Sequence, residues 1–138
     1  MALVLDTGVV LAALDAEDPD HDRCAELMGD ADEQLLLPVP VLVELDYWIA
    51  KKASVEVWQA FCEDIDAGTY SLMHLDSHLL VAAAELQVRF ADPRIGLVDA
   101  AVFSTCELIG EDKVATLDQR HFSVLRTTDG RSLRLLPR

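Results

Sequence analysis

Short apolar runs alternate with segments of helical period along this chain of 138 residues, and this alternation limits the fold more than any other feature. Runs with the length of buried strands cover residues 2–6, 34–38, 70–75 and 113–118, with a possible fifth at 133–137. Strands that are separated by helices usually pair in parallel, and helices then cover both faces of the sheet. The pattern therefore predicts an α/β fold with a mostly parallel central sheet of four to five short strands flanked by helices.

Helical spacing is found in the segments between these runs. Helices are expected over residues 7–16, 21–28, 41–52, 55–67, 76–90 and 97–108. Gly29 is expected to close the second helix and Gly110 to follow the last, because glycine adopts the left-handed conformation that ends many helices. The chain has no linker and no internal repeat, so residues 1–138 are predicted to form a single domain.

The cellular location is predicted from three absences in the sequence. The longest apolar run, residues 35–43, is far shorter than the roughly 20 residues of a membrane span. The first ten residues contain Asp6 and no Lys or Arg, unlike a signal peptide. Cys24, Cys62 and Cys106 lie in helical segments without metal-ligand spacing and are expected to be reduced core residues. These features predict a cytoplasmic protein without a membrane segment.

The formal net charge of −14 is concentrated in the first half of the chain. Residues 1–70 contain 16 acidic and 3 basic residues, whereas residues 71–138 contain 9 acidic and 8 basic residues. The acidic residues are densest over 15–33, where Arg23 is the only base. Such a surface repels phosphate, so a bound polyanion would need metal ions or the more basic second half.

Two aspartates follow predicted strands directly. Asp6 ends the first apolar run and Asp118 ends the fourth. Each could simply cap a helix or open a turn, because aspartate is favoured at both positions. In parallel sheets, however, ligands bind at the carboxyl ends of the strands, and both aspartates are expected there.

Glu44 and Asp99 have no basic residue three or four positions away on their predicted helices. A carboxylate in apolar surroundings is costly unless it is paired or binds a metal. Asp99 could also be a first-turn acid that the helix dipole favours. Asp46 has equally apolar neighbours, so periodicity does not decide between Glu44 and Asp46, only one of which can point at a given site.

If Asp6, Glu44, Asp99 and Asp118 converge, their mutual repulsion calls for divalent cations. An all-carboxylate site without Cys or His favours Mg²⁺ or Mn²⁺ over zinc. Such ions can activate water and stabilise the charge on a phosphate during in-line displacement. Phosphodiester hydrolysis is therefore the chemistry that these residues predict.

Four motifs, in this order, resemble one known family along nearly the whole chain. They are "VLDTGVVLAAL", "PVLVELDYW", "GLVDAAVFSTCELIG" and "VATLDQRHFSVL". The chain resembles the PIN-domain ribonucleases, and specifically the VapC-type toxins of bacterial toxin–antitoxin systems. The resemblance identifies Asp6, Glu44, Asp99 and Asp118 with the acidic quartet of the family, which selects Glu44 over Asp46. It also matches Thr116 to a hydroxyl that often lies beside the last acid.

The resemblance implies RNA cleavage that depends on Mg²⁺ or Mn²⁺, a homodimer, and inhibition by a VapB-type antitoxin.

From the charge distribution, Arg89, Arg94 and Arg120 are the expected phosphate contacts, with ordinary surface bases as the alternative. His121 is close enough in sequence to Asp118 to line the site, although a surface role is more common for an isolated histidine. Trp48 and Trp58 are expected in the core, in a dimer contact or in an antitoxin groove.

Other functions remain open from the residues alone. The tripeptide Asp6-Thr7-Gly8 also occurs in aspartic proteases, but those enzymes are nearly all β, and an aspartyl phosphatase would usually carry a second aspartate in place of Gly8. A PIN-type nuclease of RNA processing without an antitoxin is a further alternative. So is a non-enzymatic acidic module that binds a basic protein.

Overall fold

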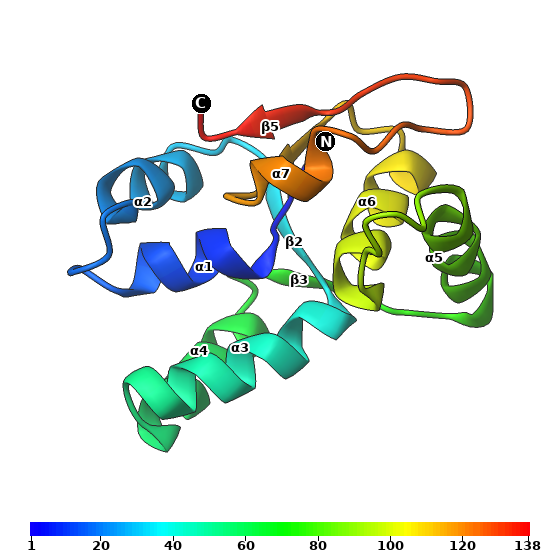
Figure 1. Ribbon diagram of the computed structural model, residues 1–138. Helices are drawn as coiled ribbons and strands as arrows, with labels where there is room; N and C mark the ends of the chain where they lie inside the picture. The colour runs from blue at the N-terminus through cyan, green and yellow to red at the C-terminus, as the bar shows by residue number, and fades with distance from the viewer.

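Five short strands form the centre of the molecule in a computed structural model that describes residues 1–138 (Figure 1). The strands are β1 (Ala2–Val4), β2 (Gln34–Pro38), β3 (Ser71–Met73), β4 (Lys113–Ala115) and β5 (Arg134–Leu136). β2 pairs with both β1 and β3, β4 pairs with β5, and every pairing is parallel. The prediction of a parallel α/β fold is confirmed.

The two groups of strands meet at a single parallel bridge between Leu5 and Ala115. There the N–H of Asp6 donates to the carbonyl of Ala115 at 2.9 Å. The strand order across the molecule is therefore β3-β2-β1-β4-β5, and the chain moves outward from β1 to β3 before it returns to β4. This reversal between β1 and β4 is the type of place where α/β sheets bind ligands.

Seven helices surround the strands. They are α1 (Thr7–Leu14), α2 (His21–Gly29), α3 (Val39–Lys52), α4 (Val55–Asp66), α5 (Ser77–Arg89), α6 (Leu97–Ile109) and α7 (Gln119–Phe122). Helices α1 to α4 lie on one side of the strands and α5 and α6 on the other (Figure 1). Right-handed crossovers explain this division, because reversing the direction of travel across the sheet moves the connecting helices to the opposite face.

The predicted helix ends differ from the structure at a few positions. α3 begins at Val39, two residues earlier than expected, because proline is tolerated in a first turn and Pro40 occupies it. Gly29 is the last residue of α2 rather than a left-handed cap, and Asp30 follows it in a right-handed conformation. Gly110 does end α6 in the left-handed conformation, with φ of 76°. The short helix α7 was not predicted.

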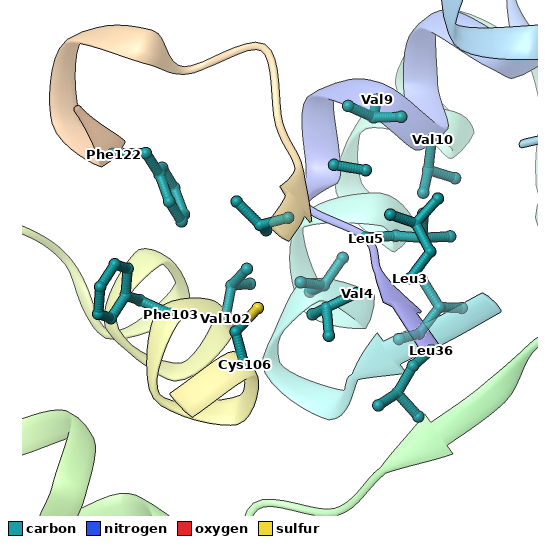
Figure 2. Close-up of a cluster of buried hydrophobic side chains, with 14 of the residues drawn as sticks. Leu3, Val4, Leu5, Val9, Val10, Leu36, Val102, Phe103, Cys106 and Phe122 are labelled. Carbon is teal, nitrogen blue, oxygen red and sulfur yellow. The ribbon is translucent and has the colours of Figure 1, made fainter. Parts of the chain in front are cut away.

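The core lies between the strands and the helices on either side of them (Figure 2). Along β1 the side chains alternate, so that Leu3 and Leu5 point toward α1 whereas Val4 points toward α6. All three are buried. Phe122 of α7 packs on Phe103 of α6, with ring centroids 6.5 Å apart, and this contact anchors α7 beside the end of β4.

The structure can be compared with two of the features used to predict the location, the apolar segments and the cysteines. No helix is both long enough and apolar enough to cross a membrane. The three cysteines are free, with Cys24 and Cys106 buried as expected and Cys62 of α4 only partly buried. The cytoplasmic location itself stays a prediction.

Candidate active site

Asp6 is held rigidly where β1 ends and α1 begins. It is the N-cap of α1, and its Oδ1 accepts a hydrogen bond from the N–H of Thr7 at 2.8 Å. Its Oδ2 accepts from the hydroxyl of Thr116 at 2.8 Å, and the residue is only 5 % exposed. The capping interpretation and the site interpretation of Asp6 are thus compatible, because one carboxylate performs both tasks.

Thr116 connects the two strand ends of the site. Its fully buried hydroxyl donates to Asp6 and accepts from the N–H of Asp118 at 3.0 Å. One side chain therefore sets the distance between the carboxylate after β1 and the backbone after β4. The family resemblance matched Thr116 to a hydroxyl beside the last acid, Asp118. The structure shows that this hydroxyl contacts the first acid, Asp6, as well.

Glu44 reaches the same site from α3. Its Oε1 accepts a hydrogen bond from the hydroxyl of Thr7 at 2.6 Å, and it lines a pocket together with Asp6. Asp46 is exposed to solvent and does not line that pocket, so of the two acids only Glu44 faces it. The role of Thr7 was missed, although its position after a strand-end aspartate is the signal that could have identified it.

Asp99 and Asp118 come together through α6 and α7. Asp118 is the N-cap of α7, and its Oδ1 accepts from the N–H of His121 at 3.0 Å. The Nδ1 atom of His121 lies 2.8 Å from the Oδ2 of Asp118 and 3.6 Å from the Oδ2 of Asp99. His121 thus lines the site, as its nearness to Asp118 in the sequence allowed.

The four predicted carboxylates line one shallow pocket of about 440 Å³. Its lining consists of Asp6, Thr7, Gly8, Glu44, Asp99, Leu117, Asp118 and His121. No Lys or Arg belongs to this lining, so His121 is the only side chain there that could carry a positive charge. The repulsion expected among the carboxylates is therefore not relieved by ion pairs with strong bases.

Burial and neighbouring charges both raise pKa values in this site. Burial raises the pKa of the Asp6 carboxyl above its ordinary value, against the opposing effect of the hydrogen bonds from Thr116 and Thr7. Burial, followed by the charges of Asp6 and Asp118, raises the pKa of Asp99 to about 7. Without a cation, ionising the whole set at neutral pH is costly.

The donor set fits a hard divalent cation. Carboxylate oxygens from separate elements face one pocket that has no Lys or Arg in its lining. Burial is the main cause of the raised pKa values of Asp6 and Asp99, and the neighbouring carboxylates raise them further. Mg²⁺ and Mn²⁺ are the ions that carboxylate oxygens favour. The residues therefore match the predicted cofactor class, with the imidazole of His121 as an additional donor that the all-carboxylate prediction did not include.

The three arginines predicted to contact RNA do not line this pocket. Arg89 donates to the backbone carbonyls of Arg126 and Thr127, which gives it a structural task. Arg94 is exposed in the turn before α6, and Arg120 is exposed on α7, within two residues of Asp118. Arg94 and Arg120 are thus free of such backbone contacts, and the RNA-binding role of the three residues stays a prediction.

Residues 3–126 match the PIN domain family, and the chain therefore belongs to that family. Among its relatives is the ribonuclease VapC26 of Mycobacterium tuberculosis. The two are 30 % identical over 135 residues, which covers 98 % of this chain and all of VapC26. The predicted resemblance to VapC-type PIN ribonucleases is confirmed, and the chain is a homologue of a nuclease.

Solved structures of toxin–antitoxin proteins share the fold. VapC20 of Mycobacterium tuberculosis, a toxin that cleaves the sarcin–ricin loop, matches with a TM-score of 0.74 and 20 % identity over 83 % of this chain and 87 % of that one. FitAcB of Neisseria gonorrhoeae matches with a TM-score of 0.72 and 16 % identity over 99 % and 97 %. DNA-bound VapBC of Salmonella typhimurium matches with a TM-score of 0.71 and 18 % identity over 98 % and 96 %.

The first prediction concerns the hydroxyl of Thr116. We expect Thr116→Val to lower the free energy of unfolding by about 1–3 kcal/mol, because it leaves a buried oxygen of Asp6 and the N–H of Asp118 unpaired. Thr116→Ser keeps the hydroxyl and should cost only about 1 kcal/mol for the lost methyl group. Urea denaturation measures both values, and equal losses would contradict the bridging role.

The second prediction concerns the pH dependence of stability without metal. Asp99 has a folded-state pKa of about 7 against an ordinary value of 3.8, so the folded protein retains a proton that the unfolded chain has lost between these values. The free energy of unfolding should therefore fall as the pH rises through this window. We expect Asp99→Asn to be more stable than wild type by roughly 1–3 kcal/mol at pH 8 in EDTA.

The same comparison at pH 5.5 provides the control. There the folded wild-type protein still carries the proton, so the advantage of Asp99→Asn should shrink to about half. Urea denaturation at both pH values measures the difference. An advantage that does not change with pH would mean that the substitution acts through packing rather than through charge.

Proposed function

We propose that this protein is a divalent-metal-dependent endoribonuclease and the toxin of a type II toxin–antitoxin pair. The observation that carries the proposal is the pocket in which Asp6, Glu44, Asp99 and Asp118 meet without a lysine or arginine. Full-length similarity to the ribonuclease VapC26 supports RNA as the substrate class. The non-enzymatic acidic module is less well supported, because Asp6 is buried and the side chain of Asp99 is only 22 % exposed, whereas a surface that captures a basic protein would present its acids to solvent.

Mg²⁺ or Mn²⁺ would be held by Asp6, Glu44, Asp99 and Asp118, and when bound it would acidify a water and stabilise the charge on the scissile phosphate. Thr116 holds the Asp6 carboxylate in place, and Thr7 does the same for Glu44. The hydroxyl of Thr116 lowers the pKa of Asp6 and so favours the ionised state that binding a cation requires. The chain thus contributes a preorganised acidic pocket, and Thr7 and Thr116 are its positioning residues.

RNA must enter a pocket whose own lining contains four carboxylates and no Lys or Arg. Arg120 lies next to His121 on α7. Arg94 lies in the turn before α6, the helix that carries Asp99. Each arginine is therefore close in the sequence to a residue that lines the pocket. We propose Arg94 and Arg120 as phosphate contacts and retain Arg89 as a weaker candidate, because it already binds backbone carbonyls.

A VapB-type antitoxin is the proposed partner. Several of the similar structures are toxin–antitoxin complexes, including VapBC of Salmonella typhimurium. The acidic pocket could accept a guanidinium of the partner, which binds carboxylates bidentately without a metal. Trp48 lines an apolar groove with Leu11, Leu14 and Val57, whereas Trp58 is partly buried and stacks on Phe61. Trp48 is thus the better candidate for an antitoxin contact, and a homodimer remains part of the proposal.

The third prediction tests the metal site and the nuclease activity together. We expect Glu44→Gln to lower the rate of RNA cleavage in Mg²⁺ or Mn²⁺ by at least roughly a hundredfold, because it removes a charge from the pocket while keeping the size of the side chain. Asp46→Asn is the matched control, since Asp46 is two residues away on α3 and exposed. It should cleave RNA at the wild-type rate. Equal rates for the two variants would contradict the assignment of the site.

The same variants separate a toxin from a nuclease of RNA processing. Expression of the wild-type chain or of Asp46→Asn should arrest bacterial growth, and expression of Glu44→Gln should not. Co-expression with the small reading frame beside the gene should restore growth and give a complex without RNase activity. Active cleavage in vitro without any growth arrest would favour the processing nuclease.

The fourth prediction concerns the path of the RNA. Replacing Arg94 and Arg120 by Ala should weaken RNA binding and flatten its dependence on salt, because each lost phosphate contact reduces the slope by about 1. Arg131→Ala is a suitable control, since Arg131 pairs with Asp129 on an exposed loop away from the pocket. Fluorescence anisotropy at several salt concentrations measures the slopes. An unchanged slope for the double variant would exclude these two contacts.

A further inference from the structure

His121 occupies a position that the four-carboxylate description of the site does not explain. Asp118 caps α7 by accepting a hydrogen bond from the backbone N–H of His121 at its Oδ1, at 3.0 Å. The imidazole is therefore not needed to cap the helix. Its Nδ1 instead faces two carboxylates from different elements, Asp118 at 2.8 Å and Asp99 at 3.6 Å.

These distances suit three ligands of one cation. One atom from each of Asp99, Asp118 and His121 lies within 4.8 Å of the other two. Adjacent ligand atoms that are each about 2.1 Å from a metal ion are about 3 Å apart in octahedral geometry. The two Nδ1–oxygen distances lie on either side of that value, so an ion could bind all three groups with small side-chain movements.

We infer that His121 is a nitrogen ligand of the divalent cation, together with Asp99 and Asp118, and that it gives the site a preference for Mn²⁺ over Mg²⁺. Mg²⁺ favours oxygen ligands almost exclusively, whereas imidazole nitrogen favours first-row transition ions. In the structure the 2.8 Å contact with Asp118 is a hydrogen bond that Nδ1–H donates, because an ionised carboxylate can only accept. Coordination would require the neutral imidazole to carry its single proton on Nε2 instead, which frees the Nδ1 lone pair for the cation. The inference rests on the proposed metal-dependent function and specifies which of the two expected ions the residues favour.

Pulsed EPR of the purified protein loaded with Mn²⁺ tests this inference directly, without RNA. A coordinated imidazole should give ¹⁴N modulation in the wild-type protein. His121→Gln should abolish the modulation and weaken Mn²⁺ binding by about tenfold or more in calorimetry, because it removes the nitrogen donor. Mg²⁺ affinity should change much less, so the preference for Mn²⁺ should largely disappear. His78→Gln is the control, since His78 is exposed on α5 and does not line the pocket.

The outcomes distinguish this inference from the proposed function. Tight Mn²⁺ binding without ¹⁴N modulation in the wild-type protein would overturn the ligand role and leave the nuclease proposal standing. Equal loss of Mn²⁺ and Mg²⁺ affinity in His121→Gln would also overturn it, because His121 would then only position Asp118. Absence of binding of either ion to the wild-type protein would overturn both proposals. The wild-type spectrum does not depend on the folding of any variant.

Discussion

The contact between β1 and β4 is the feature on which the site depends. The two strands meet at one bridge, between Leu5 and Ala115, and beyond it each strand ends in the acidic pocket. The hydrogen bond from Thr116 to Asp6 extends this contact by one side chain. Because α/β sheets open where the chain reverses direction between neighbouring strands, this is where side chains from distant segments can converge.

Convergence of carboxylates has an energetic cost that the fold must offset. Packing of α6 and α7 through Phe103 and Phe122 helps to hold Asp99 and Asp118 at the pocket. The hydrogen bond from Thr116 lowers the pKa of Asp6 and so opposes the effect of burial there. No such hydrogen bond lowers the pKa of Asp99, and burial with the charges of Asp6 and Asp118 raises that pKa to about 7. A bound cation would offset this cost, so metal binding is expected to stabilise the folded chain.

The acidic surface and the proposed substrate are less contradictory than the net charge of −14 suggests. A divalent cation in the pocket would offset part of the negative charge that RNA meets at the point of reaction. Arg94 and Arg120 come from the half of the chain in which acids and bases nearly balance. The acidic segment 15–33 covers the loop before α2, α2 itself and the loop that follows, and its residues do not line the pocket.

Local patterns in the sequence were enough to predict the strands, six of the helices and the strand-end positions of Asp6 and Asp118, because these depend on periodicity and on residues near each other in the chain. Periodicity could not choose between Glu44 and Asp46, since both lie on α3 and the choice depends on which face packs against the sheet. It also could not detect the hydrogen bond of Thr7 to Glu44, or the approach of His121 to Asp99. Those contacts join residues that are far apart in sequence or on different elements, so only the tertiary structure, which brings β1, α3, α6 and α7 to one end of the sheet, decided them.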